Sequence, residues 1–321
     1  MKIVILDEYL VCRGNLDFEA LRQFGEVVSY PTTARGEAAE RIGDAEAVFL
    51  NRVVIDREVL SRCPNLHFIG ITATGYNMID LEAAGEFGVT VCNVPAYSTE
   101  AVAQLTFALL LEIACGMSAL SAHVHAGNWR SPLDPFVAEH RSFELCGKTM
   151  GIVGMGDIGY RVAQLANAFG MDVLGYRRHP DRSLERENLH FCDLDDLLER
   201  SDVVSVHCPL TSETRGLIGE RELARMKDGA VLLNTSRGPV LNEAAVAAAL
   251  DSGKLYAAGL DVLSSEPPKE DNPLARHPRC VVTPHVAWTP RETRARLIGV
   301  CVENLRCFLE GRPQNVVNQK A

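Results

Sequence analysis

The sequence lacks any close pairing of its cysteines. Ten cysteines are spread over 321 residues with no C-x-x-C pair and no short, regular spacing. This distribution excludes the ligand pattern of a small zinc domain and the framework of a disulfide-stabilised secreted domain. We therefore read the thiols as reduced and expect a cytoplasmic protein.

A basic surface and a clear membrane span are also missing. The formal net charge is −10 and the pI is near 5.4, so nucleic acid and anionic membranes would be repelled overall. The most apolar window, residues 101–120, contains Gln104 and Glu112, and we read it as a helix buried between domains or subunits. The opening MKIVILDEYL has no signal-peptide pattern, and no internal repeat is evident. We expect neither nucleic acid nor a membrane as a partner.

What the sequence does contain is a regular alternation of short apolar strands and helices. The first series has the strands KIVILD, EVVSY, AEAVFLN, LHFIGIT and VTVCNV, with the helices LDFEALRQFG, DREVLSRC and DLEAAGEFG. The second series begins near residue 147 with TMGIVG and a helix over 157–169, followed by the strands MDVLGY, DVVSVHC, AVLLNT, YAAGLDV and CVVTP. Such alternation predicts parallel strands joined by right-handed crossovers.

Two long helices mark the borders of these series. The first is predicted over 99–120, with Ser98 or Thr99 as its N-cap. The last, roughly 290–310, has no further strand to pair with in the second series, so we expect it to return to the first domain. The prediction is an α/β fold with two doubly wound parallel-sheet domains. A Rossmann domain of residues 99–288 is inserted in a flavodoxin-like substrate-binding domain made of 1–98 and 289–321.

A glycine-rich turn opens the second series. GMGDIG matches G-x-G-x-x-G at Gly154, Gly156 and Gly159 and lies between a predicted strand and a predicted helix. In that context the turn presents bare N–H groups and the positive end of a helix to a pyrophosphate. The alternative is a tight glycine turn without a ligand.

An acidic residue is missing where a dinucleotide site often has one. The strand after the glycine-rich turn ends in GYRRHP, with Arg177 and Arg178 in place of the Asp or Glu that binds the ribose hydroxyls. An arginine can pair with a 2′-phosphate, which favours NADP over NAD. The alternative is that both arginines are solvated or stack on the adenine, which leaves NAD acceptable.

Three polar residues follow predicted strands, at the edge where open α/β sheets build their sites. They are Arg237 in NTSRGPV, Glu266 in SSEPP and His285 in TPHVAW. An arginine can clamp a carboxylate, and a histidine oriented by a carboxylate can transfer a proton. Each residue also has an ordinary reading: a capping arginine, a surface glutamate and a buried structural imidazole.

The order of motifs GMGDIG, HCPLTSET, NTSRGPV, GLDVLSSEPP and TPHVAW resembles the D-isomer-specific 2-hydroxyacid dehydrogenases over essentially the whole chain. The resemblance implies that Arg237 binds the substrate, that His285 is the acid/base and that Glu266 supports it. It also implies substrate contacts from the ATGYN loop and a set of dinucleotide contacts. The implied substrate residues, with Arg52 added as a loop cation, are Arg52, Ala73, Thr74, Gly75 and Trp288. Together with the glycines of the turn and the two arginines, the expected cofactor residues are Thr99, Gly154, Gly156, Asp157, Ile158, Gly159, Arg177, Arg178, His207, Cys208, Pro209, Thr214, Thr235, Ser236, Arg237, Asp261 and His285.

Within the family, the stretches 93–112 and 283–297 look most like glycerate dehydrogenases, also called hydroxypyruvate reductases. The expected activity is NAD(P)H-dependent reduction of hydroxypyruvate or glyoxylate to D-glycerate or glycolate. D-lactate dehydrogenase, a short D-3-phosphoglycerate dehydrogenase and a dinucleotide-sensing corepressor are the alternatives. We expect a homodimer through the helix at 99–120, and no metal, because His123 and His125 in HVHAG have no further ligands nearby.

Overall fold

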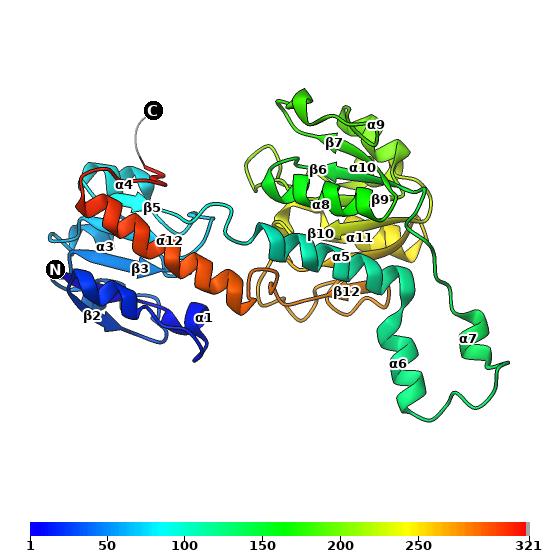
Figure 1. Cartoon of the computed structure of the whole chain (residues 1–321), viewed down its shortest axis with the longest axis horizontal. Coiled ribbons are helices and arrows are strands. Elements are labelled where there is room, and N and C mark those ends of the chain that lie inside the picture. Colours follow the sequence, from blue (N-terminus) through cyan, green and yellow to red (C-terminus); the bar gives the residue numbers. More distant parts are fainter. Residues whose placement is uncertain (319–321) are drawn as a thin grey trace. The chain divides into compact units, whose positions relative to one another are not determined.

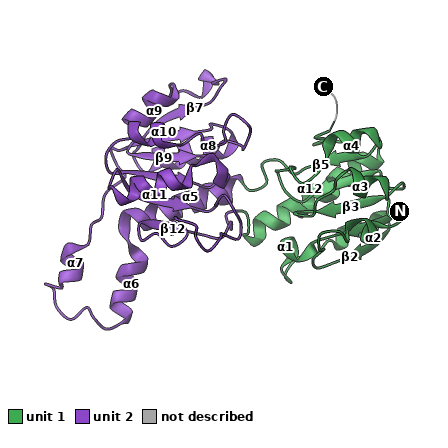
Figure 2. Cartoon of the chain, turned by 180° about the vertical axis from the view of Figure 1, so that it is seen from behind, with its two compact units in different colours: residues 1–98, 288–321 green, residues 99–287 purple. Residues whose placement is uncertain are grey.

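The computed structural model describes residues 1–318, and the chain divides into two compact units. The first unit comprises Met1–Ser98 and Trp288–Ala321, and the second comprises Thr99–Ala287 (Figure 2). The chain therefore passes from one unit to the other twice. Trp288 falls in the first unit, one residue before the predicted start of that segment, and residues 319–321 of the predicted domain lie outside the described part.

The first unit is built on a five-stranded parallel sheet in the order β2-β1-β3-β4-β5. Its strands are β1 (Lys2–Ile5), β2 (Glu26–Ser29), β3 (Ala47–Leu50), β4 (Phe68–Ile71) and β5 (Thr90–Cys92). Its helices are α1 (Glu8–Cys12), α2 (Ala38–Ile42), α3 (Arg57–Ser61), α4 (Leu81–Glu86) and α12 (Arg291–Leu309), with a 3-10 helix at Glu19–Phe24. This strand order is the flavodoxin-like one.

Both faces of this sheet are buried. On one face Phe49 and Phe68 pack against Leu297 and Leu305 of α12, and all four are fully buried. The last long helix thus returns to the first unit, and Figure 1 shows α12 lying along the sheet of that unit. The opposite face packs on α2, α3 and α4, so the unit has helices on both sides.

The second unit has a seven-stranded parallel sheet in the order β12-β11-β10-β9-β6-β7-β8. Its strands are β6 (Thr149–Val153), β7 (Asp172–Tyr176), β8 (Leu189–Phe191), β9 (Val203–Val206), β10 (Ala230–Asn234), β11 (Leu255–Leu260) and β12 (Cys280–Val282). Its helices are α5 (Thr99–Cys115), α6 (Met117–His125), α7 (Pro135–Glu139), α8 (Asp157–Ala168), α9 (Leu194–Arg200), α10 (Glu220–Arg225) and α11 (Glu243–Asp251). Short 3-10 helices lie at Arg182–Leu184 and Gly238–Val240. Reading from β8, the order is that of a Rossmann sheet with one added strand, which confirms the predicted class of two doubly wound α/β domains.

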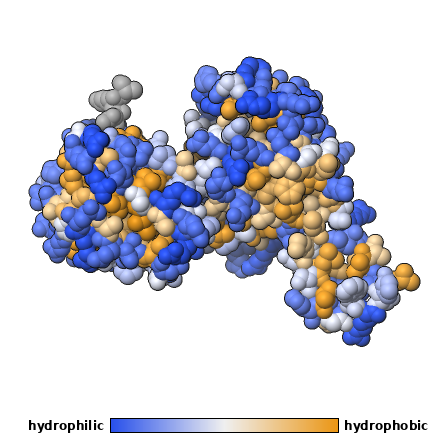
Figure 3. Space-filling model, viewed as in Figure 1, coloured by the Kyte–Doolittle hydropathy of each residue, from blue (hydrophilic) through white to orange (hydrophobic). Residues whose placement is uncertain are grey.

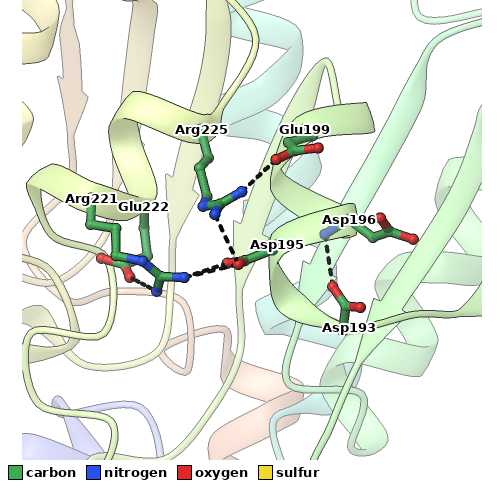
Figure 4. Close-up of polar contacts among 7 residues, drawn as sticks. All are labelled: Asp193, Asp195, Asp196, Glu199, Arg221, Glu222 and Arg225. Atoms are coloured by element: carbon green, nitrogen blue, oxygen red, sulfur yellow. Dashed lines mark hydrogen bonds and ion pairs between the residues drawn. The ribbon is translucent and has the colours of Figure 1, made fainter.

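The helices of the second unit cover opposite faces of its sheet. α5 and α8 pack on one face, and α9, α10 and α11 on the other. At the surface α9 and α10 are joined by ion pairs, in which Asp195 accepts from Arg221 at 2.8 Å and Arg225 at 3.2 Å (Figure 4). Each of these exposed ion pairs contributes little to the free energy of folding, so the helices are held on the sheet mainly by their buried apolar residues.

Two sequence predictions about helices are wrong. The helix predicted over 99–120 breaks at Gly116, whose φ of +58° ends α5, and α6 continues at an angle of 60°. The segment 16–25 is not an α-helix but carries the 3-10 helix Glu19–Phe24. Its buried residues Phe18 and Leu21 are three positions apart, which is the 3-10 period.

Within residues 1–318, no single helix is long and apolar enough to cross a membrane. Only the bent pair of α5 and α6 passes that test, and it does so by length and composition alone.

Candidate active site

The glycine-rich turn between β6 and α8 has the geometry that a pyrophosphate requires. Gly154 has φ +105°, and a Cβ there would lie 2.5 Å from the Cys208 nitrogen. A Cβ on Gly159 would lie 2.2 Å from the Gly154 oxygen, so α8 approaches the turn closely. Gly156, by contrast, faces open space. Asp157 and Ile158 then begin α8, whose first N–H groups are free of helical partners.

The tip of β7 carries the two arginines that replace the expected acid. Arg177 Nη1 donates to the Met155 carbonyl at 3.2 Å, which fixes it against the glycine-rich turn. Arg178 forms an ion pair with Glu213 in the loop after β9, and both side chains are about two-thirds exposed. Glu213 was not identified from the sequence, because nothing in the residues pairs positions 35 apart.

The loop after β9 is closed by its own side chains. Thr214 Oγ1 donates to the Pro209 carbonyl at 2.6 Å, and the Thr211 N–H donates to Thr214 Oγ1 at 2.7 Å. Cys208 is buried, and that burial raises the pKa of its thiol to about 11. The thiol is therefore protonated at neutral pH, and it packs instead of reacting.

The turn after β10 is shaped by Asn234, a fully buried residue that sequence reasoning missed. Its Oδ1 accepts from the Ser236 N–H at 3.0 Å and from the Ser236 hydroxyl at 2.8 Å. Its Nδ2 donates to the Arg237 carbonyl at 3.0 Å. A buried asparagine at the end of an apolar strand is the signal that could have found it, since a buried amide needs partners nearby. The Arg237 side chain itself is half-buried, with Nη1 donating to the Ser236 carbonyl at 2.8 Å.

Gly238 brings two loops into direct backbone contact. A Cβ at this position would lie 2.0 Å from the carbonyl carbon of Leu263 and 2.4 Å from the Ser264 nitrogen. Leu263 and Ser264 begin the loop that carries Glu266. The turn that carries Arg237 and the loop that carries Glu266 are therefore in direct backbone contact, so a movement of one displaces the other.

His285 and Glu266, two of the three predicted catalytic residues, are in direct contact. Nδ1 of His285 donates to Glu266 Oε2 at 2.6 Å, and the two side chains are 27% and 31% exposed. His285 has φ +52°, and its own N–H donates to the Asp261 carbonyl at 2.8 Å. With Nδ1 facing the carboxylate, Nε2 is the nitrogen left to exchange a proton.

Asp261 holds the backbone that presents this histidine. It is 1% exposed, and its carboxylate accepts from the Thr283 hydroxyl at 2.6 Å and from the Val286 and Ala287 N–H groups at 2.9 Å each. A dinucleotide contact was predicted for Asp261, and it stays a prediction. The structure gives this carboxylate an anchoring role in the loop.

The strand register explains why these residues share one edge. Asn234 of β10 pairs with Leu260 of β11, and Leu260 pairs with Val282 of β12. Arg237, Asp261 and His285 each follow one of these strands within three residues. The glycine-rich turn follows β6 at the same carboxyl edge of the sheet.

In the first unit a buried carboxylate organises the loop of Arg52. Asp7 is 5% exposed and accepts from the Asn51 N–H at 2.8 Å and from the Arg52 N–H at 2.7 Å. Burial raises the pKa of Asp7, which these hydrogen bonds partly oppose. Asn51 Nδ2 in turn donates to the Thr72 carbonyl at 2.5 Å, just before the ATGYN loop. Neither Asp7 nor Asn51 was identified from the sequence.

The remaining predicted substrate residues also lie in the first unit. Ala73, Thr74 and Gly75 follow β4, where the Thr74 hydroxyl donates to the Val94 carbonyl at 2.8 Å. The guanidinium of Arg13 lies 5.7 Å from the centre of the Trp288 ring. Thr99, predicted as a cofactor residue, is the first residue of α5 in the second unit.

The first histidine of HVHAG, His123, has a structural partner. His123 Nε2 contacts Asp134 Oδ2 at 2.8 Å, and the His123 ring stacks on Phe136 with centroids 4.3 Å apart. Across residues 1–318, no group of three or more His, Cys, Asp or Glu side chains is arranged to hold a metal ion.

The donor set at the carboxyl edge of the second sheet fits a dinucleotide. The turn supplies a cradle that a Cβ would fill at Gly154, open space at Gly156 and a helix N-terminus behind them. Arg237 adds a cation, and the His285–Glu266 pair adds a proton donor with a fixed ring orientation. Together they can bind an anionic substrate and protonate it beside a hydride donor.

Comparison with known proteins agrees with this arrangement. Residues 107–287 match the NAD-binding domain of the D-isomer-specific 2-hydroxyacid dehydrogenases. The chain is 46% identical to a hydroxypyruvate reductase of Blautia hydrogenotrophica, over 99% of this chain and 100% of that one. It is 41% identical to a glyoxylate reductase of Aeropyrum pernix, over 83% and 80% of the two chains. It resembles the crystal structure of an Aquifex aeolicus D-lactate dehydrogenase complexed with NAD and lactic acid, with a TM-score of 0.85, 28% identity and full coverage of both chains. The chain therefore belongs to the D-isomer-specific 2-hydroxyacid dehydrogenases, NAD(P)-dependent oxidoreductases that act on a CH–OH group.

Proposed function

We propose that this enzyme reduces hydroxypyruvate, and the smaller glyoxylate, to D-glycerate and glycolate. The observation that carries the proposal is the His285–Glu266 pair, placed at the same sheet edge as Arg237 and the glycine-rich turn. Hydroxypyruvate reductase and glyoxylate reductase are also the names of its relatives at 46% and 41% identity.

The proposed chemistry divides the work among three side chains. Arg237 binds the substrate carboxylate and polarises the neighbouring carbonyl. The glycine-rich turn would hold the pyrophosphate of a dinucleotide, whose reduced nicotinamide would supply a hydride to the carbonyl carbon. His285 gives the proton on Nε2 to the carbonyl oxygen, and Glu266 holds the ring through Nδ1. His285 then regains a proton from water, so the net reaction consumes one reduced dinucleotide and one proton per 2-oxo acid.

We further propose that the first unit contributes to substrate binding through the Arg52 side chain and the backbone N–H groups of residues 73–75. These groups follow β3 and β4, at the carboxyl edge where open α/β sheets bind ligands. Trp288 is the proposed apolar contact of the substrate.

The absorbance of the reduced dinucleotide during turnover tests the activity. Wild-type protein should oxidise it with hydroxypyruvate, and Arg237→Ala and His285→Ala should each lose at least about 100-fold in kcat/KM. The matched controls are Arg221→Ala, in the exposed α9–α10 ion pairs, and His190→Ala, on the exposed side of β8. Wild-type protein that binds dinucleotide but reduces no 2-oxo acid would contradict the proposal, and a higher kcat/KM with pyruvate would favour a lactate dehydrogenase.

For the dinucleotide we propose a preference for NADP through Arg177. The guanidinium next to the glycine-rich turn can pair with a 2′-phosphate. Arg178 is paired with Glu213, a carboxylate that competes with a phosphate for the same cation. In kcat/KM, Arg177→Asp should shift the preference toward NADH, whereas Glu213→Gln should shift it toward NADPH. A ratio that neither substitution changes would refute a role for this corner of the site.

We also propose a homodimer in the cytoplasm. α6 has no buried residue, and the segment 116–140 extends from the body of the second unit (Figure 2). The described residues include twelve exposed large apolar side chains, and six of them lie in this segment: Met117, Val124, Trp129, Leu133, Phe136 and Val137. Figure 3 shows apolar surface on this segment and on the front of the second unit. A second copy of the chain is the proposed partner, to be tested by light scattering.

All ten cysteines are free, which suits the reducing environment of the cytoplasm.

A further inference from the structure

Four polar side chains lie beneath the carboxyl edge of the second sheet and form a continuous hydrogen-bonded chain. Ser205 Oγ lies 2.8 Å from Nε2 of His207, and Nδ1 of His207 lies 3.5 Å from Thr235 Oγ1. Thr235 Oγ1 lies 3.0 Å from Thr106 Oγ1, which donates to the Val102 carbonyl at 2.8 Å. The chain therefore joins β9, the end of β10 and helix α5. It is distinct from the His285–Glu266 pair.

These hydrogen-bonded side chains lie where the strand order of the sheet reverses, between β6 and β9. β9 lies beside β6, and connections leave to opposite sides from these two strands. The His207 N–H donates to the Val153 carbonyl at 2.8 Å, next to the glycine-rich turn. Open α/β sheets bind their ligands at this switch point. Thr235 directly precedes Ser236 and Arg237.

Counting hydrogens fixes the direction of the chain. A neutral imidazole has one N–H, and each hydroxyl has one hydrogen to donate. If Ser205 donates to Nε2, then Nδ1–H donates to Thr235, Thr235 donates to Thr106, and Thr106 donates to the Val102 carbonyl. In the reverse direction, the Ser205 hydroxyl has no acceptor among the described residues and the Val102 bond is lost. Ser205 is fully buried, so a hydroxyl hydrogen left without an acceptor there is unfavourable.

The environment of His207 also keeps its ring neutral. Burial of the ring lowers the pKa of His207 far below its ordinary value of 6.5. Among residues 1–318, the hydrogen-bond partners of its ring are the hydroxyl groups of Ser205 and Thr235, with no carboxylate to stabilise a charged ring. A charged imidazolium would also place a second N–H against Ser205, which could no longer donate to Nε2.

We propose that His207 is a positioning residue: a neutral imidazole, protonated on Nδ1, that fixes the Thr235 hydroxyl and with it the turn that presents Arg237. His207 transfers no proton to substrate. The functional part of this inference rests on the proposed reduction of a 2-oxo acid. The protonation state rests only on the hydrogen-bonded chain.

The protonation state is tested by nitrogen NMR on the full-length protein labelled with ¹⁵N-histidine, without dinucleotide or substrate. The His207 signals are assigned by their loss in His207→Asn. We expect Nδ1 to show the shift of a protonated ring nitrogen and Nε2 that of an unprotonated one, unchanged from about pH 8 to pH 5. Protonation on Nε2, or titration of the ring near pH 6.5, would overturn the proposal.

The positioning role is tested by a double-mutant cycle between His207→Leu and Thr235→Val. If the two side chains act as one unit, the double variant should lose no more kcat/KM than the worse single variant, whereas losses that multiply would overturn the proposal. In His207→Asn the amide nitrogen takes the place of Nδ1 and still donates to Thr235. It should therefore recover at least about tenfold in kcat relative to His207→Leu, and the pH profile of kcat should stay that of wild type. A changed profile would mean that His207 takes part in proton transfer.

These readings separate the two proposals. If wild-type protein reduced no 2-oxo acid, the proposed function would fail, while the NMR result would still decide the protonation state. The effect of Thr235→Val on the dinucleotide Kd, measured by fluorescence, would then report on the turn without catalysis.

Discussion

The contact between Gly238 and the Leu263–Ser264 backbone makes a sharp prediction about Gly238→Ala. The new Cβ would lie 2.0 Å from a carbonyl carbon, whereas ordinary van der Waals contact begins near 3.4 Å. One of the two loops must therefore move by about 1.4 Å. The Ser264 N–H donates to Glu243 at 2.7 Å, and the Leu263 N–H donates to Glu266 at 3.4 Å, so this movement strains the anchors of the glutamate loop.

The expected cost follows from the size of that displacement. Misplacing a catalytic group by about 1 Å lowers the rate about 100-fold, so we expect a loss of that order in kcat/KM with hydroxypyruvate. Overpacking should lower the free energy of unfolding by about 1–3 kcal/mol. The dinucleotide Kd should change less than about threefold, because Gly154 and α8 follow a different strand.

Steady-state kinetics, thermal unfolding and dinucleotide titration on one preparation measure these three quantities. The matched control is Gly299→Ala on the exposed side of α12, where a Cβ meets nothing within 4 Å. That change should leave kcat/KM unaltered and stabilise the helix by about 0.5–1 kcal/mol. If Gly238→Ala keeps more than a third of the wild-type kcat/KM, the coupling of the two loops through this contact is refuted.

Three further predictions concern other parts of the chain. Asp7→Asn removes carboxylate acceptors from the N–H groups before Arg52. It should raise the KM for the 2-oxo acid about tenfold at nearly constant kcat, and an unchanged KM would argue against Arg52. Because the pKa of His207 is lowered in the folded state, the unfolded chain takes up a proton below pH 6.5 that the folded chain refuses, so stability is lost as the pH falls. Thermal melts should therefore show a smaller drop from pH 7.5 to pH 5 in His207→Asn than in wild type, and equal drops would contradict the shift. Leu133→Asp, at a side chain that is 86% exposed, should shift the dimer toward monomer in light scattering without lowering the melting temperature of a dilute sample. An unchanged dimer would exclude this segment.

All strands except β8 (Leu189–Phe191) could be predicted, because most buried parallel strands are continuous apolar runs. Ala47–Leu50 is completely buried and apolar, and Ala230–Asn234 is completely buried with a polar residue only at its last position. The helices α1 and α2, of five residues each, show no clear helical period and were not predicted, although the equally short α3 was. The break at Gly116 was hidden because the apolar residues continue on both sides of it.

From the sequence, a site role could be proposed only for residues whose own functional group suggests one. Arg237, Glu266 and His285 follow apolar strands and have functional groups that suggest roles. Asp7 and Asn234 could not be assigned, because their function is to satisfy backbone groups that only the folded loop brings near. Likewise, the pairing of Arg178 with Glu213 depends on how two separate loops close.

The return of α12 to the first sheet also sets the order in which the chain can fold during synthesis. The first 98 residues contain all five strands, but the helix that covers Phe49 and Phe68 begins only at Arg291. About 190 residues of the second unit are made in between. At about 5–20 residues per second, ribosomes need about 10–40 s for that stretch. The second unit can therefore fold first, while one apolar face of the first sheet stays exposed until α12 is made. That exposed face is a surface to which chaperones can bind.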